Sequence, residues 1–131
     1  MTKIEALAKH LETEVDNLKE NDDCNFEDGG NSYMVLTDEE ADDKAKEYII
    51  DSLWAFNASF LASHCDLDQD VIESIQANEK CESNNPVFKK LINDLDHFVS
   101  DAISADGRGH FLNTYDGEEH EAGEFLIYRT N

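Results

Sequence analysis

Acidic side chains recur at helical spacing in the middle of the chain, where they could bind a cationic surface. The first set has spacings of three, four and four: Glu40, Asp43, Glu47 and Asp51. On a helix such neighbours lie about 5–6 Å apart at Cβ, so their carboxylates would form a row. A second set has similar spacings: Asp66, Asp70 and Glu73. With their acidic neighbours, the predicted binding residues are Glu39, Glu40, Asp42, Asp43, Glu47, Asp51, Asp66, Asp68, Asp70 and Glu73.

A second group of chemically active side chains lies near the C-terminus: His110, Asp116, Glu118, Glu119, His120 and Glu121. Imidazole and carboxylate groups can hold a divalent metal. However, neither histidine has the H-x-x-x-H or H-E-x-x-H spacing of a helical metal site. We expect a solvated hairpin loop here, with no metal ligands and no cofactor. A metal-dependent enzyme using this cluster is kept as an alternative.

Other candidate sites fit their motifs less well. Asp66-Leu67-Asp68-Gln69-Asp70 begins like a calcium loop, but Val71 and Ala77 stand where that loop needs Gly and Glu. The adjacent His64 and Cys65 need not pair in space, and an inert Cys65 is the expectation. His10, His64 and His97 fall in helical patterns that indicate surface or core-edge positions. We find no phosphate-loop, dinucleotide or nucleophile-elbow motif and predict that the protein is not an enzyme.

Net charge restricts the partners. Thirty-one acidic and ten basic residues give a formal charge of −21 over 131 residues. Such a surface repels nucleic acid and anionic membranes, so we expect no direct binding to either. The charge is concentrated: residues 21–47 carry ten acids and two lysines, a net −8, and residues 48–82 carry seven acids and one lysine, a net −6. A solvated face that keeps the protein soluble is the alternative explanation.

Composition also indicates the compartment. No apolar run approaches the 18 residues typical of a transmembrane helix, and the first residues lack the apolar core of a signal peptide. Three widely spaced cysteines without a C-x-x-C pair favour reduced thiols. We therefore predict a cytoplasmic protein, located in the host cytoplasm if it is encoded by a phage.

The first twenty residues predict an amphipathic helix of about five turns, from Thr2 to Glu20. Its apolar residues recur every three or four positions: Ile4, Ala8, Leu11, Val15 and Leu18. This face could pack against the rest of the fold or against a second copy of the chain. A structural or regulatory assembly protein that dimerises through this helix is therefore a further alternative.

Residues 21–131 predict one compact α+β domain. Asp28–Asn31 is a turn, Tyr33–Leu36 a strand, and Thr37–Glu40 a capping box that starts a helix over 38–63. A shorter helix follows Asp68, and Asn85-Pro86 opens another that ends at 106–109. Phe111-Leu112 and Phe125–Tyr128 predict a hairpin whose second strand pairs with residues 33–36. The expected fold is three to four helices packed with a small antiparallel sheet.

Several segments resemble a family of small proteins carried by bacteriophages and other mobile elements. The strongest are Asp106–Leu112 (DGRGHFL) and Tyr115–Glu119 (YDGEE), supported by Leu36–Ala41 (LTDEEA) and Asp51–Asn57 (DSLWAFN). The resemblance covers residues 33–131 and brings no established activity. It implies a context, because small acidic phage proteins often resemble DNA mimics that block restriction or CRISPR enzymes. The leading hypothesis is therefore a non-enzymatic inhibitor that uses carboxylates to occupy a basic groove of a nucleic-acid-binding host protein.

Overall fold

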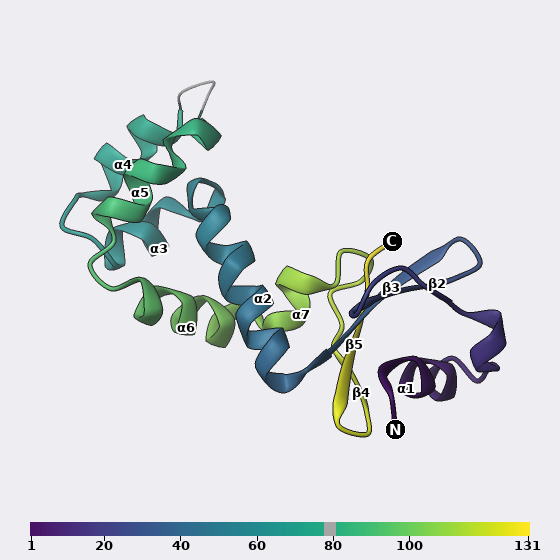
Figure 1. Ribbon diagram of the computed structural model, residues 1–131. Helices are drawn as coiled ribbons and strands as arrows, with labels where there is room; N and C mark the ends of the chain where they lie inside the picture. The colour runs from purple at the N-terminus through teal and green to yellow at the C-terminus, as the bar shows by residue number, and fades with distance from the viewer. Residues whose placement is uncertain (78–80) are drawn as a thin grey trace. The chain divides into compact units, whose positions relative to one another are not determined.

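The computed structural model describes residues 1–77 and 81–131, which form an α+β fold as predicted (Figure 1). The helices are α1 (Lys3–His10), α2 (Asp38–Asp51), α3 (Ala58–Ser63), α4 (Gln69–Gln76), α5 (Asn85–Leu91), α6 (Leu95–Asp106) and α7 (Arg108–Leu112). Three short 3₁₀ turns, η1 to η3, occupy Val15–Asn17, Leu53–Ala55 and Cys81–Asn84. The strands are β1 (Lys19–Glu20), β2 (Asn25–Asp28), β3 (Asn31–Thr37), β4 (His120–Ala122) and β5 (Phe125–Arg129).

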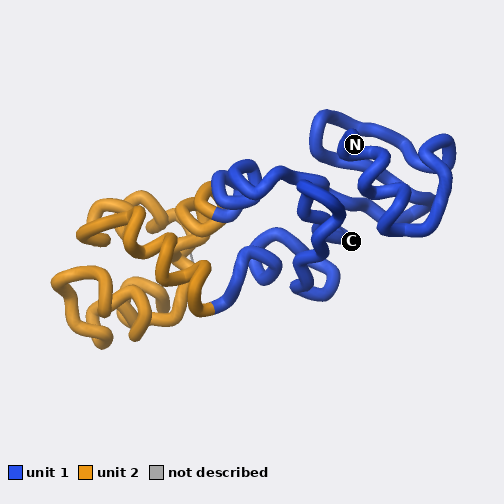
Figure 2. The backbone as a smooth tube through the Cα atoms, turned by 90° about the horizontal axis from the view of Figure 1, so that it is seen from below, with its two compact units in different colours: residues 1–45, 106–131 blue, residues 46–105 orange. Residues whose placement is uncertain are grey.

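The chain divides into two compact units, coloured separately in Figure 2. Unit 1 comprises residues 1–45 and 106–131, and unit 2 comprises residues 46–105. This division differs from the predicted one, which separated a helix over residues 1–20 from a single domain over 21–131. The first twenty residues belong to unit 1 because their apolar side chains join its core.

A five-stranded antiparallel sheet in the order β1-β2-β3-β5-β4 forms the centre of unit 1. The predicted turn at 28–31 connects β2 to β3, and β3 pairs with β5 as expected, with Val35 opposite Ile127. Because side chains alternate across a strand, Tyr33, Val35 and Ile127 share one face. There they pack with Ala6 and Leu7 of α1, among other buried residues. Helix α7 also contacts β5.

The first helix is much shorter than predicted, since α1 ends at His10 rather than continuing to Glu20. Glu12 adopts a left-handed conformation with φ 55°, and Thr13 N–H donates to the Ala8 carbonyl at 2.9 Å, which closes the helix end. The chain then turns back. Leu11 and Leu18 pack beside Ile4 against the core of unit 1. The predicted dimerisation face, comprising Ile4, Ala8, Leu11, Val15 and Leu18, therefore does not exist as one helical stripe.

The predicted long helix over 38–63 is interrupted after Asp51. The Asn85 side chain accepts a hydrogen bond from Trp54 N–H at 3.1 Å and donates to the Ile50 carbonyl at 2.8 Å. Gln76 Nε2 donates to the carbonyl of Phe56 at 2.6 Å. Side chains from distant segments thus satisfy backbone groups that a continuous helix would pair internally. Asn57 then caps α3, accepting from Ser59 N–H at 2.9 Å.

The helix predicted from Asn85 onward is likewise two helices, α5 and α6. Ile92 is extended, and Asn93 N–H donates to the His64 carbonyl at 2.9 Å, which ends α5. Asp94 then accepts from His97 N–H at 3.2 Å at the start of α6. Within unit 2, α3 contacts α4. Aromatic rings of Phe56 and Phe60 pack edge-on against Phe98, with centroids 5.1 and 5.0 Å away.

The predicted first strand of the C-terminal hairpin is a helix, because Phe111 and Leu112 lie in α7. Gly109 permits the packing of this helix. A Cβ there would collide with the Gly117 carbonyl oxygen, so this short helix approaches the following loop closely through a glycine. The hairpin partner of β5 is instead β4, connected to it through Gly123 at φ 63°.

Candidate functional site

The first turn of α2 uses Glu40 for structural contacts. Thr37 Oγ1 accepts from Glu40 N–H at 3.2 Å, and Glu40 accepts from Thr37 N–H at 2.9 Å, so the predicted capping box forms. Lys3 Nζ lies 2.8 Å from the same carboxylate. The Lys3 hydrogen bond, together with those from Thr37, lowers the pKa of Glu40 to about 2. Glu40 is therefore ionised and already paired within unit 1.

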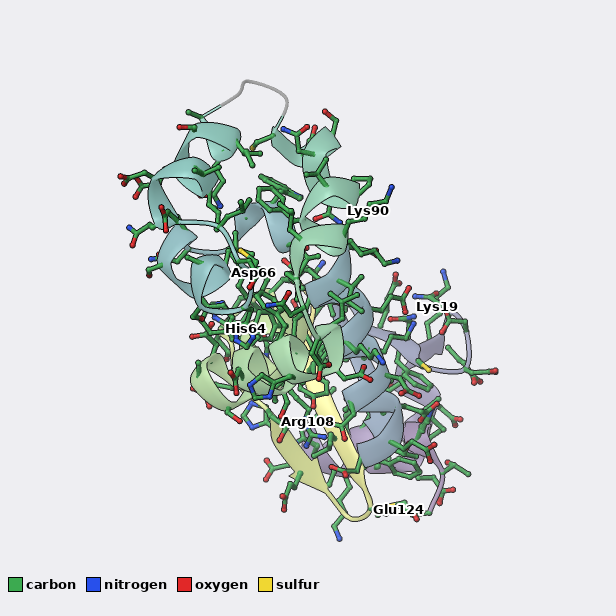
Figure 3. All side chains as sticks on the ribbon, turned by 90° about the vertical axis from the view of Figure 1, so that its left-hand side faces the viewer. Lys19, His64, Asp66, Lys90, Arg108 and Glu124 are labelled. Atoms are coloured by element: carbon green, nitrogen blue, oxygen red, sulfur yellow. The ribbon has the colours of Figure 1, made fainter. Side chains whose placement is uncertain are left out.

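Arg108 neutralises further acids of α2. Its side chain is labelled in Figure 3. The guanidinium lies 2.9 Å from Asp38 Oδ1, 3.0 Å from Asp42 Oδ1 and 3.0 Å from Glu119 Oε1, and the side chain is only 16% exposed. Tyr128 donates its hydroxyl to Glu119. Burial, followed by that bond to Glu119, raises the pKa of the Tyr128 hydroxyl. The Arg108 cluster thus joins α2, α7 and the segment before β4 within unit 1.

Four acids of α2 are exposed, and their side chains make no ion pair or hydrogen bond with any residue in 1–77 or 81–131: Glu39, Asp43, Glu47 and Asp51. We call them the α2 row. They recur at intervals of four, so each lies one turn beyond the last. The row differs from the predicted set by replacing Glu40 with Glu39. Glu39 and Asp43 belong to unit 1, and Glu47 and Asp51 belong to unit 2.

The other predicted acids lie around the start of α4 in unit 2, and all are exposed: Asp66, Asp68, Asp70 and Glu73. We call them the α4 group. Asp68 is the N-cap residue as predicted, but its side chain makes no capping bond. Asp66 accepts from Asn93 at 3.4 Å, and Glu73 accepts from Gln69 at 3.0 Å. Asp66 precedes the helix, so only Asp70 and Glu73 have the helical spacing that was predicted for three.

The C-terminal histidines and acids are dispersed. His110 lies on α7, Glu119 contacts Arg108, and the His120 ring on β4 lies 4.9 Å from that of His10. Within residues 1–77 and 81–131, no three of these six predicted side chains bring ligand atoms together. The alternative of a metal-dependent enzyme at this cluster therefore lacks a coordination site in the described part of the chain.

A different group converges in unit 2, composed of His64, His97 and Asp101. His64 Nε2 lies 3.0 Å and His97 Nε2 lies 3.4 Å from Asp101 Oδ2. Both histidines were expected at surface or core-edge positions. The spacing of four between His97 and Asp101 on one helix was a signal for two members of the group. Nothing local indicated His64, since it joins them through tertiary packing.

The remaining predictions concern thiols and membranes. Cys24, Cys65 and Cys81 are free and half-buried. In the described part of the chain, no helix has the length and apolar character needed to cross a membrane.

Comparisons of the chain with protein-family models, curated proteins and solved structures found no match. The resemblance to phage-encoded proteins therefore stays a prediction, and the function is inferred from the residues themselves.

Proposed function

We propose that the protein is a non-enzymatic inhibitor that binds, through its exposed carboxylates, the basic groove in which a host protein normally holds nucleic acid. The single observation that supports this proposal is the α2 row. Its carboxylates, Glu39, Asp43, Glu47 and Asp51, recur at each turn of one helix face and are not neutralised by neighbouring lysines or arginines among the described residues.

The pattern of internal ion pairs strengthens the proposal. Lys3 and Arg108 neutralise Glu40, Asp38 and Asp42, whose carboxylates stabilise unit 1. Lys3 and Arg108 thus pair with acids that stabilise unit 1, and the acids of the α2 row can bind a partner. Binding of these carboxylates to a basic groove would release bound counterions, as the binding of a nucleic acid does. This release makes binding strongest at low salt.

The α4 group supplies a second candidate contact. No lysine or arginine occurs in the sequence between Lys46 and Lys80. The four acids of this group therefore have no basic neighbour along the chain. The resemblance to small phage proteins supports a host defence enzyme as the partner, of the restriction or CRISPR type. We infer that this binding takes place in the host cytoplasm.

The experiment tests the two halves of the row separately. The double variants E39K/D43K and E47K/D51K each reverse two charges inside a single unit. Partners are first captured from a bacterial lysate on the wild-type chain, eluted with a NaCl gradient and identified. Each is then tested for loss of nucleic-acid binding in the presence of each variant. We expect at least one double variant to weaken inhibition about tenfold or more, with a shallower salt dependence.

The matched control is E121K/E124K, which makes the same charge change at exposed positions outside α2. Glu40 is left intact, because its replacement would disturb the contacts of Lys3 and Thr37. Circular dichroism and thermal unfolding verify that all variants fold. If both α2 variants inhibit as well as the control does, or if the captured partner stays bound to its nucleic acid, the proposal is wrong. That outcome would leave the acids with a solubilising role.

A further inference from the structure

The end of α3 and the first turns of α6 bring two imidazoles and a carboxylate together inside unit 2. His64 Nε2 and His97 Nε2 lie 3.0 and 3.4 Å from the same oxygen, Asp101 Oδ2. One ligand atom from each residue lies within 4.8 Å of the other two. We propose that His64, His97 and Asp101 bind one divalent transition-metal ion of the Zn²⁺ type.

Packing fixes the most buried ligand in place. The His64 side chain is 7% exposed, and its ring centroid lies 5.3 Å from that of Phe60 and 5.1 Å from that of Phe98. Its backbone is held as well, since its N–H donates to Leu61 at 3.1 Å and its carbonyl accepts from Asn93 at 2.9 Å. The ring therefore has little freedom to lose when a metal binds, which favours a preorganised site.

Helix geometry positions the other two ligands. His97 and Asp101 are four residues apart on α6, so their side chains lie on the same face, one turn apart. The ring centroids of His64 and His97 are 5.2 Å apart. The two elements thus contribute one ligand from the end of α3 and two from successive turns of α6.

The separations suit a small metal ion. Zinc binds histidine nitrogen and carboxylate oxygen at about 2.0–2.2 Å in tetrahedral geometry, which places neighbouring ligand atoms about 3.4 Å apart. Both distances to Asp101 Oδ2 are close to this value. Two imidazoles with one carboxylate favour zinc and other transition metals over calcium and magnesium, which prefer oxygen ligands.

One side of the group is open to solvent. The His97 side chain is 64% exposed and that of Asp101 is 45% exposed. A metal ion can therefore reach both residues without any unfolding of the packing around His64. Unit 2 also contains eleven acidic and four basic residues, a net charge of −7 that attracts cations. Three protein ligands with an exposed side leave the fourth tetrahedral position to water, as in catalytic rather than structural zinc sites.

The test measures binding of Zn²⁺ alone to the full chain, after chelator treatment and under thiol-reducing conditions. We expect one ion per chain by equilibrium dialysis and calorimetry, and a rise in melting temperature that a chelator reverses. Co²⁺ serves as a spectroscopic probe, and its visible absorption should indicate nitrogen and oxygen ligands without sulfur-to-metal charge transfer.

Two variants remove ligands. His97→Ala replaces an exposed side chain, and Asp101→Asn preserves the shape of its residue while removing the charge. We expect either to weaken Zn²⁺ binding more than about 100-fold, because loss of an outer-shell partner alone costs about 10–100-fold. The matched control, His120→Ala, removes a histidine that also has a histidine neighbour, His10, and should leave the affinity unchanged.

Three results would overturn the proposal. The first is the absence of stoichiometric Zn²⁺ binding to the wild-type chain. The second is equal affinity in His97→Ala, Asp101→Asn and the control. The third is a sulfur-to-cobalt band that disappears in Cys65→Ser, since that would place the ion on the neighbouring thiol instead of on Asp101.

Discussion

The two units hold their acidic residues in different ways. Unit 1 carries twenty acidic and six basic residues, a net −14, and holds the half-buried Arg108 among three carboxylates. Unit 2 has aromatic rings that pack edge-on around Phe98, and it keeps the carboxylates of the α4 group in solvent. Acidity is therefore part of the packing in unit 1 and mainly a surface property in unit 2. We expect the two units to respond differently to core truncation, charge removal and acid.

The largest effect is expected in the aromatic core of unit 2. Phe98 is fully buried and contacts Phe56, Phe60 and His64. Phe98→Ala should lower the free energy of unfolding of unit 2 by about 3–5 kcal/mol, because it leaves a cavity. The only tryptophan, Trp54, belongs to this unit, so its fluorescence during urea unfolding measures the loss. If the β3 and β5 amides are protected from hydrogen exchange as well in the variant as in the wild type, unit 1 is unaffected. If they lose protection together with the amides of unit 2, the two units unfold together.

In unit 1, the largest loss of stability is expected where an added methyl group would collide with backbone atoms. Gly109→Ala places a Cβ against the Gly117 carbonyl, and we expect a loss of about 2–3 kcal/mol. The sign is informative, because Ala in place of Gly inside a helix otherwise stabilises by about 1 kcal/mol. Gly30→Ala is the control, since nothing lies within 4 Å of its Cβ position. Hydrogen exchange of β5 amides provides the measurement, and a stabilised Gly109→Ala variant would contradict the close approach of α7.

Removal of the central cation should reveal the electrostatic part of unit 1. Arg108→Gln leaves Asp38, Asp42 and Glu119 without their shared positive partner, and we expect a loss of about 2 kcal/mol. Salt screens repulsion between these partly exposed acids, so the loss should diminish as NaCl rises. The Phe98→Ala loss should not. Melting temperatures of both variants across a NaCl series test the contrast, and parallel salt responses would remove the proposed distinction between the units.

A smaller effect is expected at Glu40 and depends on pH. Its pKa is lowered in the folded protein from 4.5 to about 2, chiefly by the Lys3 hydrogen bond. Its contribution to stability is therefore present above about pH 4.5 and is lost as the pH falls toward 2. After allowance for solvent screening of a half-exposed group, we expect about 1 kcal/mol. Glu40→Gln should lower stability at neutral pH and flatten the acid limb, whereas the unpaired Glu39→Gln should do neither. Urea midpoints between pH 2 and 7 measure both.

Local signals predicted the turn at 28–31, the capping box at Thr37 and Glu40, and the β5 strand. The pairing of β5 with β3 also forms as expected, although the two strands are far apart in the sequence. Helix ends without a local stop signal were missed. Asn85 and Gln76 interrupt the predicted helix over 38–63 from 20 or more residues away, and no window around residue 52 contains that information.

The candidate sites show the same limit. The acids of α2 and α4 and their exposure follow from composition and periodicity, which depend only on the sequence. The tertiary structure decides which acids are free and which are paired. Lys3 and Arg108 pair with acids of α2 although they are at least 35 positions away from them in the chain. The meeting of His64 with His97 and Asp101 has the same cause. A periodic pattern specifies the face of a helix, whereas long-range packing determines what that face contacts.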